Sequence, residues 1–232
     1  MIQRLVLLPG MDGTGELFAD FVKALPQGFE TESVRYPADA CLSYPELMTF
    51  VRSAVPATEP FVLLAESFST PLAIQFAATN PSNLKGLVLC AGFATGPVRG
   101  WTRFLCSFLS PILFHVVLPR LAASFLLVGP DASSSLHIAI RTAVSSVKPK
   151  VLSARLRSVL DCDAQAELGQ ITVPILYIQA SHDRLVRVSC LEEIRRIKPQ
   201  TVVATIASAH LLLQKEPKQS AEVVARFANQ LI

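Results

Sequence analysis

Six short runs of aliphatic and β-branched residues alternate with helix-length segments along this chain of 232 residues. We expect strands at residues 2–8, 31–36, 61–65, 86–90, 175–179 and 202–206. Helical patterns between them cover residues 16–25, 44–54, 71–79, 190–197 and 221–231. This alternation is typical of a mostly parallel sheet with crossover helices, and the near-continuous apolarity of the strands indicates that helices cover both faces. The sequence therefore predicts an α/β fold.

Residues 96–163 interrupt this alternation, because they contain no good strand and several apolar helical segments, such as 101–109, 112–127 and 151–160. We interpret this stretch as a helical insertion that lies over the carboxyl edge of the sheet, where open α/β sheets bind their ligands. The expected organisation is a core domain of residues 1–95 and 164–232, with residues 96–163 as a helical lid.

Composition argues against several classes of protein. With 51% hydrophobic and 17% charged residues, the chain has enough apolar side chains for a large core. Its net charge of +3 is spread out, so a nucleic-acid partner is not expected. No apolar segment has the length of a membrane span, and the N-terminus has the pattern of a first strand rather than of a signal peptide. Five scattered cysteines without a Cys-x-x-Cys pair favour buried thiols in a reducing compartment. We expect a cytoplasmic protein without a transmembrane segment.

Ser67 lies where an apolar strand ends and a helix begins, within Leu-Ala-Glu-Ser-Phe-Ser-Thr-Pro. A serine on such a tight turn presents its hydroxyl above the sheet edge, and small neighbours let the strand and helix backbones approach each other. Ala65 and Ser69 are the small neighbours here. The alternative is that Ser67 merely caps the helix, which is a common role of serine.

A nucleophilic serine needs a histidine base that a carboxylate orients. Among the four histidines, His115 and His137 fall in the insertion and His182 directly precedes an aspartate, whereas His210 follows the last strand. His210 is therefore the expected base.

Asp183 follows the strand at 175–179 and is the expected orienting carboxylate. A turn or cap role is the alternative for Asp183, and Asp161 and Asp163 are the alternative carboxylates.

An oxyanion hole requires two N–H groups that face the developing negative charge. The N–H of Phe68 follows the serine, and the glycine-rich loop Pro9-Gly-Met-Asp-Gly-Thr-Gly15 offers the N–H of Met11. The spacing of these glycines differs from the dinucleotide fingerprint, and no cluster has the spacing of metal ligands. We therefore expect neither a cofactor nor a metal.

At these residues the chain resembles the α/β-hydrolase superfamily, over nearly its whole length apart from the insertion. LLPGMDGTG is similar to the oxyanion loop, AESFST to the nucleophile elbow around Ser67, ASHDRLV to the acid turn around Asp183 and ASAHLLLQKEP to the histidine loop around His210. The usual elbow glycines are replaced by Ala65 and Ser69, and a common glycine of the acid turn by Ala180. The resemblance implies a six-stranded sheet of order 2-1-3-4-5-6 with the insertion as a lid.

The insertion is rich in large apolar side chains, and we expect Trp101, Phe104, Phe108 and Phe125 to bind substrate. The expected function is a serine hydrolase that cleaves carboxylic esters or thioesters of an apolar acyl group, either small or linked to an acyl carrier, through an acyl-enzyme. A thioesterase or acyltransferase for carrier-bound acyl groups is one alternative, and a non-catalytic binding protein on the same fold is another. The apolar side chains can also serve to pack the lid against the core or to contact a membrane surface.

Overall fold

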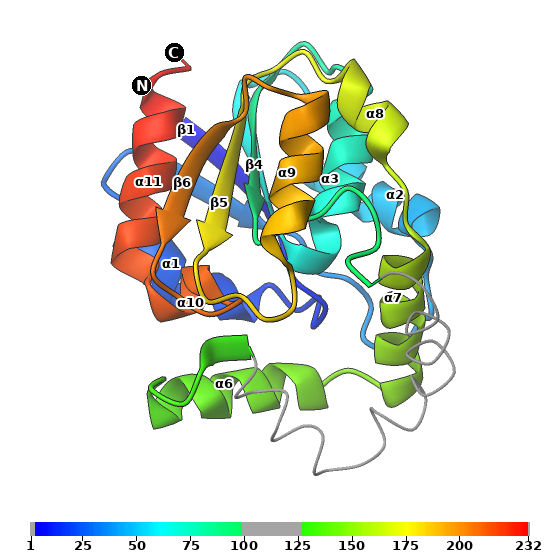
Figure 1. Ribbon diagram of the computed structural model, residues 1–232, viewed down its shortest axis with the longest axis vertical. Coiled ribbons are helices and arrows are strands. Elements are labelled where there is room, and N and C mark those ends of the chain that lie inside the picture. Colours follow the sequence, from blue (N-terminus) through cyan, green and yellow to red (C-terminus); the bar gives the residue numbers. More distant parts are fainter. Residues whose placement is uncertain (1–2, 99–126, 232) are drawn as a thin grey trace.

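A six-stranded sheet forms the centre of the protein, whose computed structural model describes residues 3–98 and 127–231 (Figure 1). The strands are β1 (Gln3–Leu8), β2 (Phe29–Ser33), β3 (Phe61–Glu66), β4 (Leu84–Cys90), β5 (Ile175–Ala180) and β6 (Val202–Ile206). Their order is β2-β1-β3-β4-β5-β6, and every neighbouring pair is parallel. The expected strand order is therefore confirmed, and the carboxyl ends of all six strands lie at one edge.

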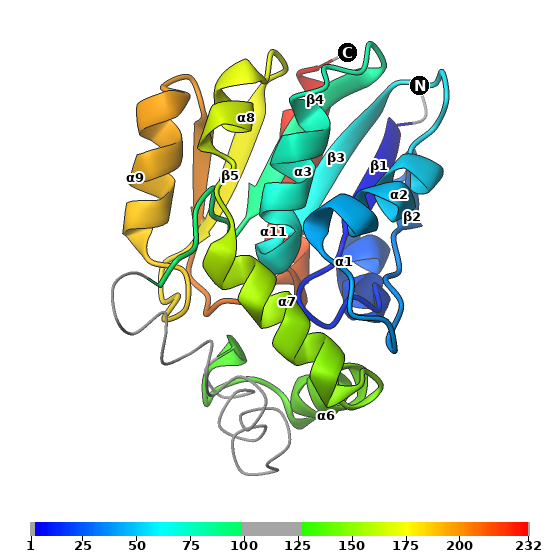
Figure 2. The ribbon, with the colours of Figure 1, turned by 90° about the vertical axis from the view of Figure 1, so that its right-hand side faces the viewer.

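Helices cover both faces of the sheet (Figure 2). One face packs against α1 (Ala19–Ala24), the short α10 (Leu212–Lys215) and α11 (Pro217–Asn229), in a core cluster that includes Phe18 of η1 (Glu16–Phe18). The other face packs against α2 (Tyr44–Ala54), α3 (Thr70–Ala77), α8 (Gln165–Gln170) and α9 (Val188–Ile197). The central strand β3 is buried along its whole length, as its unbroken apolar sequence predicted.

Two helices of the inserted segment lie beyond or beside the carboxyl edge. Figure 1 shows α6 (Ser134–Ser145) on the side toward which β5 and β6 point, and α7 (Pro149–Asp161) beside the sheet. The sequence predicts the helix at 151–160 but not α6. The start of α6 carries a capping signal, because Ser133 Oγ accepts a hydrogen bond from Leu136 N–H. Trp101, Phe104, Phe108 and Phe125 lie outside the described residues, so their expected contact with substrate stays a prediction, as does the division into core and lid.

The boundaries of β2 differ from the expected 31–36. The strand runs from Phe29 to Ser33 at the sheet edge, and its alternate residues Glu30 and Glu32 are exposed. An edge strand with charged alternate residues shows little of the apolar pattern by which strands are recognised in a sequence. For this reason the predicted strand begins at residue 31, two residues after the observed start. The apolar residues Val34 and Tyr36 leave the strand and are buried beside the site described below.

None of the described helices combines the length and the apolarity that a membrane span needs. Of the four described cysteines, Cys90 and Cys190 are buried as expected, whereas Cys41 is exposed.

Candidate active site

The turn between β3 and η2 (Ser67–Ser69) brings Ser67 to the carboxyl edge of the sheet. Ser67 has a backbone φ of 47°, in the left-handed region that residues with side chains seldom adopt. Its neighbours Glu66 and Phe68 are buried, whereas Ser67 itself is partly exposed. A partly exposed serine on a strained strand-to-helix turn is the arrangement that the sequence predicted for a nucleophile elbow.

Close packing around this turn depends on small residues and on Thr70. The Thr70 hydroxyl donates to the Ser67 carbonyl oxygen at 2.8 Å and accepts from the Phe93 N–H at 3.1 Å. A Cβ at Gly92 would lie 2.6 Å from Thr70 Cγ2, so only glycine fits there. The elbow is thereby tied to the chain that follows β4.

Ser69, which occupies a position where the family pattern has glycine, uses its hydroxyl to tie the elbow to the first loop. Its side chain is fully buried, and its Oγ lies 2.8 Å from the Tyr36 hydroxyl and donates to the Pro9 carbonyl oxygen. Tyr44 donates to the Phe68 carbonyl oxygen at 2.7 Å, beside these groups. Desolvation raises the pKa of the Tyr36 hydroxyl, which keeps it protonated and able to donate. The missing glycine is thus replaced by a small side chain with its own bonding role.

Ser67, His210 and Asp183 form one hydrogen-bonded line. His210 Nε2 lies 2.7 Å from Ser67 Oγ, and His210 Nδ1 lies 2.7 Å from Asp183 Oδ2. The side chains of His210 and Asp183 are 4% and 5% exposed. An ionised carboxylate can only accept, so Nδ1 carries the proton and Nε2 is left to accept the proton of the Ser67 hydroxyl.

Asp183 is itself held in place by the backbone that follows it. Its Oδ1 accepts hydrogen bonds from Leu185 N–H at 2.8 Å and Val186 N–H at 2.9 Å, so Asp183 also has the turn role that is the alternative reading of the sequence. One oxygen therefore orders the loop and the other faces His210.

The alternative residues lie elsewhere. His137 is on α6, His182 is exposed and His115 lies outside the described residues. Asp163 accepts from Gln165 N–H at the start of α8, and its backbone pairs with Thr95. Asp161 is at the end of α7.

The first loop folds into a tight turn opposite the elbow. Gly13 N–H donates to the Gly10 carbonyl oxygen at 3.0 Å, which makes Met11 and Asp12 the central residues of a β-turn. The Met11 N–H makes no hydrogen bond within residues 3–98 and 127–231. Phe68 is the second residue of η2, where an N–H has no partner within its own helix. Within the described part of the chain, no acceptor is therefore found for either N–H group that the sequence predicts for an oxyanion hole.

Arg155 of α7, which sequence reasoning did not single out, binds this loop. It is 2% exposed, and its guanidinium donates to the carbonyl oxygens of Met11 (2.8 Å), Asp12 (2.8 Å) and Pro37 (3.0 Å). The sequence did contain a signal for this residue, because Arg155 falls on the apolar face of an amphipathic helix. Arginine is rarely buried without partners, so such a position indicates a binding role for the side chain.

Glu66 is a buried carboxyl directly before Ser67. Its Oε2 accepts a hydrogen bond from Gln214 Nε2 at 3.2 Å, and its Oε1 has no hydrogen-bond partner among the described residues. Burial, reinforced by the negative charge of Asp12, raises the pKa of Glu66 to about 8, although the bond from Gln214 acts in the opposite direction. Glu66 is therefore protonated at neutral pH.

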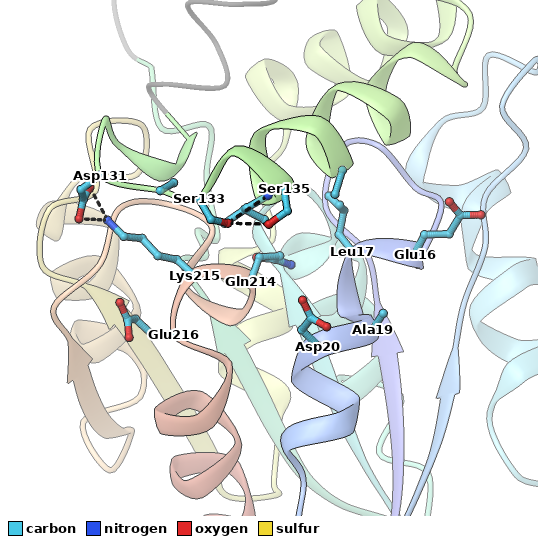
Figure 3. A pocket seen from close by; sticks show the side chains of 13 residues that line it. Glu16, Leu17, Ala19, Asp20, Asp131, Ser133, Ser135, Gln214, Lys215 and Glu216 are labelled. Atoms are coloured by element: carbon cyan, nitrogen blue, oxygen red, sulfur yellow. Dashed lines mark hydrogen bonds and ion pairs between the residues drawn. The ribbon is translucent and has the colours of Figure 1, made fainter.

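A cavity of about 480 Å³ lies between α6, η1, α1 and α10, and Gln214 is one of its lining residues (Figure 3). Its lining includes Leu17, Asp20 and Ser135. Two further lining residues, Lys215 and Asp131, form an ion pair with a distance of 2.7 Å. Ser67, His210 and Asp183 are not among the lining residues. Within the described ranges, no group of three or more His, Cys, Asp and Glu side chains is arranged to hold a metal ion.

The sequence model of one protein family, described as "Serine aminopeptidase, S33", matches residues 39–210, which is more than half of the chain. Among curated proteins, the biotin biosynthesis bifunctional protein BioHC of Cellvibrio japonicus (strain Ueda107) is 27% identical over 238 residues. That match covers 94% of this chain but 44% of BioHC, so the chain spans less than half the length of this relative.

Solved structures share the fold at low sequence identity. A bromoperoxidase from Bacillus anthracis has a TM-score of 0.85 at 16% identity, covering 99% of this chain and 92% of its own. An enol-lactonase from Burkholderia xenovorans LB400 has a TM-score of 0.79 at 15% identity, with coverages of 99% and 92%. At these identities the likeness concerns the fold.

Replacing Glu66 by glutamine is expected to change how stability depends on pH. A carboxyl whose pKa rises on folding from 4.5 to about 8 contributes stability that is fully present below pH 4.5 and is lost as the pH rises toward 8. The wild type should therefore lose up to about 5 kcal/mol relative to Glu66→Gln between pH 4.5 and pH 9. Urea unfolding across this range measures the difference, with the exposed Glu192→Gln as the matched control. A difference that is constant with pH would show that Glu66 is ionised in the folded protein.

Proposed function

The chain belongs to the family described as serine aminopeptidase, S33, and from this premise we propose that it hydrolyses esters or thioesters of an apolar acyl group, with Ser67 as nucleophile. The α/β-hydrolase fold and the hydrolase class that the sequence predicted are confirmed by this membership and by the structural neighbours. The observation that carries the finer proposal is the line of 2.7 Å contacts from Ser67 through His210 to Asp183 at the carboxyl edge of the sheet.

In the proposed reaction, Ser67 Oγ attacks the acyl carbonyl carbon while His210 Nε2 removes the hydroxyl proton. Asp183 holds the imidazole in the required tautomer and stabilises the imidazolium. The carbonyl oxygen becomes an oxyanion that accepts hydrogen bonds from the N–H groups of Met11 and Phe68. Collapse of this intermediate expels the alcohol or thiol, to which His210 returns the proton. Water, deprotonated by His210, then attacks the acyl-enzyme and releases the acid.

The electrostatics around Ser67 support this use. A protonated Glu66 adds no negative charge beside the site where the oxyanion forms. The guanidinium of Arg155 adds a positive charge beneath the loop that carries Met11. Both features favour a developing negative charge beside the buried side chains of His210 and Asp183.

An apolar acyl group is proposed because the sequence 99–126, which lies outside the described residues, is rich in large apolar side chains that include Trp101, Phe104, Phe108 and Phe125. Each methylene that a substrate buries in an apolar pocket contributes about 0.8 kcal/mol. The amide substrates that the family description implies have a poorer leaving group than esters and thioesters, so the ester or thioester is the substrate class proposed here.

Incubation with a fluorophosphonate should label Ser67, and the Ser67→Ala variant should lose both the adduct and the esterase activity. Asp183→Asn should lower kcat by about 10⁴-fold, because an amide favours the wrong histidine tautomer. Intact-mass spectrometry with peptide mapping locates the adduct, and the exposed Ser53→Ala is the control. A folded wild type that forms no adduct, or an adduct on another residue, would contradict the proposed nucleophile.

Acyl-chain preference tests the proposed substrate class. Across p-nitrophenyl esters from acetate to decanoate, kcat/KM should rise by about 4-fold per methylene until the pocket is filled. Hydrolysis of leucine p-nitroanilide should be slower than that of any of these esters. Equal kcat/KM values for short and long esters would contradict an acyl pocket, and preferred cleavage of the anilide would favour an aminopeptidase.

A carrier-linked thioester is a second candidate, favoured by the charge of the described part of the insertion. Residues 132–160 contain no Asp or Glu, while Arg141, Lys148 and Lys150 are exposed on α6, α7 and the turn between them. Such a surface favours an acidic partner, such as a protein that carries the acyl group.

The double variant Arg141→Glu, Lys150→Glu should therefore lower kcat/KM for an acyl-carrier thioester by about 10-fold, and the wild-type rate should fall with added salt. The same variant should leave hydrolysis of a small neutral thioester of the same acyl group unchanged. Equal effects on both substrates, or none on either, would rule out the carrier surface.

A further inference from the structure

Arg155 comes from the inserted segment, yet its side chain ends in the first loop of the core. Its guanidinium binds Met11 and Asp12, which lie more than 140 positions earlier in the chain. Val151 and Leu152 of the same helix, α7, belong to a small apolar cluster against which Met11 packs. Its Cζ lies 5.7 Å from the ring centroid of Tyr36 and 6.0 Å from that of Phe68, whose N–H is one of the proposed oxyanion donors. One side chain therefore contacts both halves of the proposed oxyanion hole.

The carbonyls that Arg155 binds are those that control the conformation of the turn. In the β-turn from Gly10 to Gly13, the central peptide between Met11 and Asp12 can flip by half a turn between type I and type II forms. Hydrogen bonds from the same guanidinium nitrogen, Nη1, to the Met11 and Asp12 oxygens oppose that flip. These bonds anchor the Met11–Asp12 and Asp12–Gly13 peptides. The Met11 N–H belongs to the preceding Gly10–Met11 peptide, which joins the anchored part of the turn at the Met11 Cα, so the anchored turn limits how far that N–H can rotate.

The loop is shaped to accept this contact. Gly13 has a φ of +69°, and a Cβ at this position would lie 2.5 Å from Arg155 Nη1. Among the described residues Arg155 forms no ion pair with a carboxylate, and carbonyl oxygens bind its donors instead. Burying a guanidinium is costly, and the negative charge of Asp12 offsets part of that cost. An apolar side chain of similar volume would fill the same space at lower cost.

We propose that Arg155 is a positioning residue for the oxyanion hole: its guanidinium fixes the Gly10–Gly13 turn so that the Met11 N–H faces the reacting carbonyl oxygen. This role rests on the proposed function, because it concerns the same oxyanion. It also makes α7 of the insertion a structural part of the catalytic site rather than a cover over it.

The test compares two variants. Arg155→Met keeps much of the side chain's bulk but removes its hydrogen-bond donors, whereas Arg155→Lys keeps the charge but replaces the planar guanidinium, with its several donors, by a single ammonium group. Arg157→Met, an exposed position on the same helix, is the matched control. The kcat for a p-nitrophenyl ester is measured per active site, titrated with the fluorophosphonate, so that misfolded molecules do not count.

We expect Arg155→Met to lower kcat by about 10- to 100-fold while KM changes by less than about 3-fold, because the lost interaction acts on the transition state. Arg155→Lys should fall between Arg155→Met and the wild type, and Arg157→Met should match the wild type. The inhibition constant of an alkyl trifluoromethyl ketone, whose adduct with serine carries an oxyanion, should rise in parallel with the loss of kcat.

A purely structural role predicts another pattern. The variant would then have a lower melting temperature and a smaller fraction of active sites that react with the fluorophosphonate, but its kcat per active site and its affinity for the ketone would equal those of the wild type. That pattern in Arg155→Met, or in Arg155→Lys if the methionine variant does not fold, would overturn the positioning role. The wild type distinguishes the two proposals, because a wild type without fluorophosphonate adduct on Ser67 contradicts the proposed function itself. A labelled, active wild type with unaffected Arg155 variants contradicts the positioning role without affecting the nucleophile.

Discussion

The left-handed backbone at Ser67 is the constraint around which the rest of the site is built. Such a conformation costs a non-glycine residue on the order of 1 to 3 kcal/mol and persists only where the surroundings determine it. Here β3 is buried along its length, Thr70 binds the elbow carbonyl and fits against Gly92, and the Ser69 hydroxyl joins the elbow to Pro9. The strain raises the serine hydroxyl above the sheet edge, where His210 reaches it from the loop after β6.

The two replaced elbow glycines illustrate how a departure from a family pattern is compensated locally. Ala65 is small enough to stay fully buried in β3, where glycine is usual. Ser69 adds a hydroxyl that lies between Tyr36 and the Pro9 carbonyl oxygen, so a buried polar atom is paired rather than orphaned. From the sequence these substitutions read as weaknesses of the motif, because a motif contains no information on what the added atoms contact.

Sequence reasoning located Ser67, Asp183 and His210 and the strand order, because strand-end positions follow from hydrophobic patterns and parallel strands bring their carboxyl ends together. It did not identify α6, a helix in an insertion without strands as landmarks. It also placed the start of β2 too late, because the charged residues Glu30 and Glu32 obscure the apolar pattern of this edge strand. Arg155 and Glu66 were missed for a different reason. Their surroundings are made by segments remote in sequence, so burial and pairing appear only after folding.

The contact between Arg155 and Gly13 also limits which parts of this chain can be exchanged with its relatives. Insertions in this fold vary widely and invite treatment as interchangeable modules. In this protein a graft that replaced α7 would remove the guanidinium from a loop whose glycine leaves room for it. Recombination that preserves the core would therefore have to rejoin the chain before Lys148, the N-cap of α7, so that the arginine and the loop are inherited together.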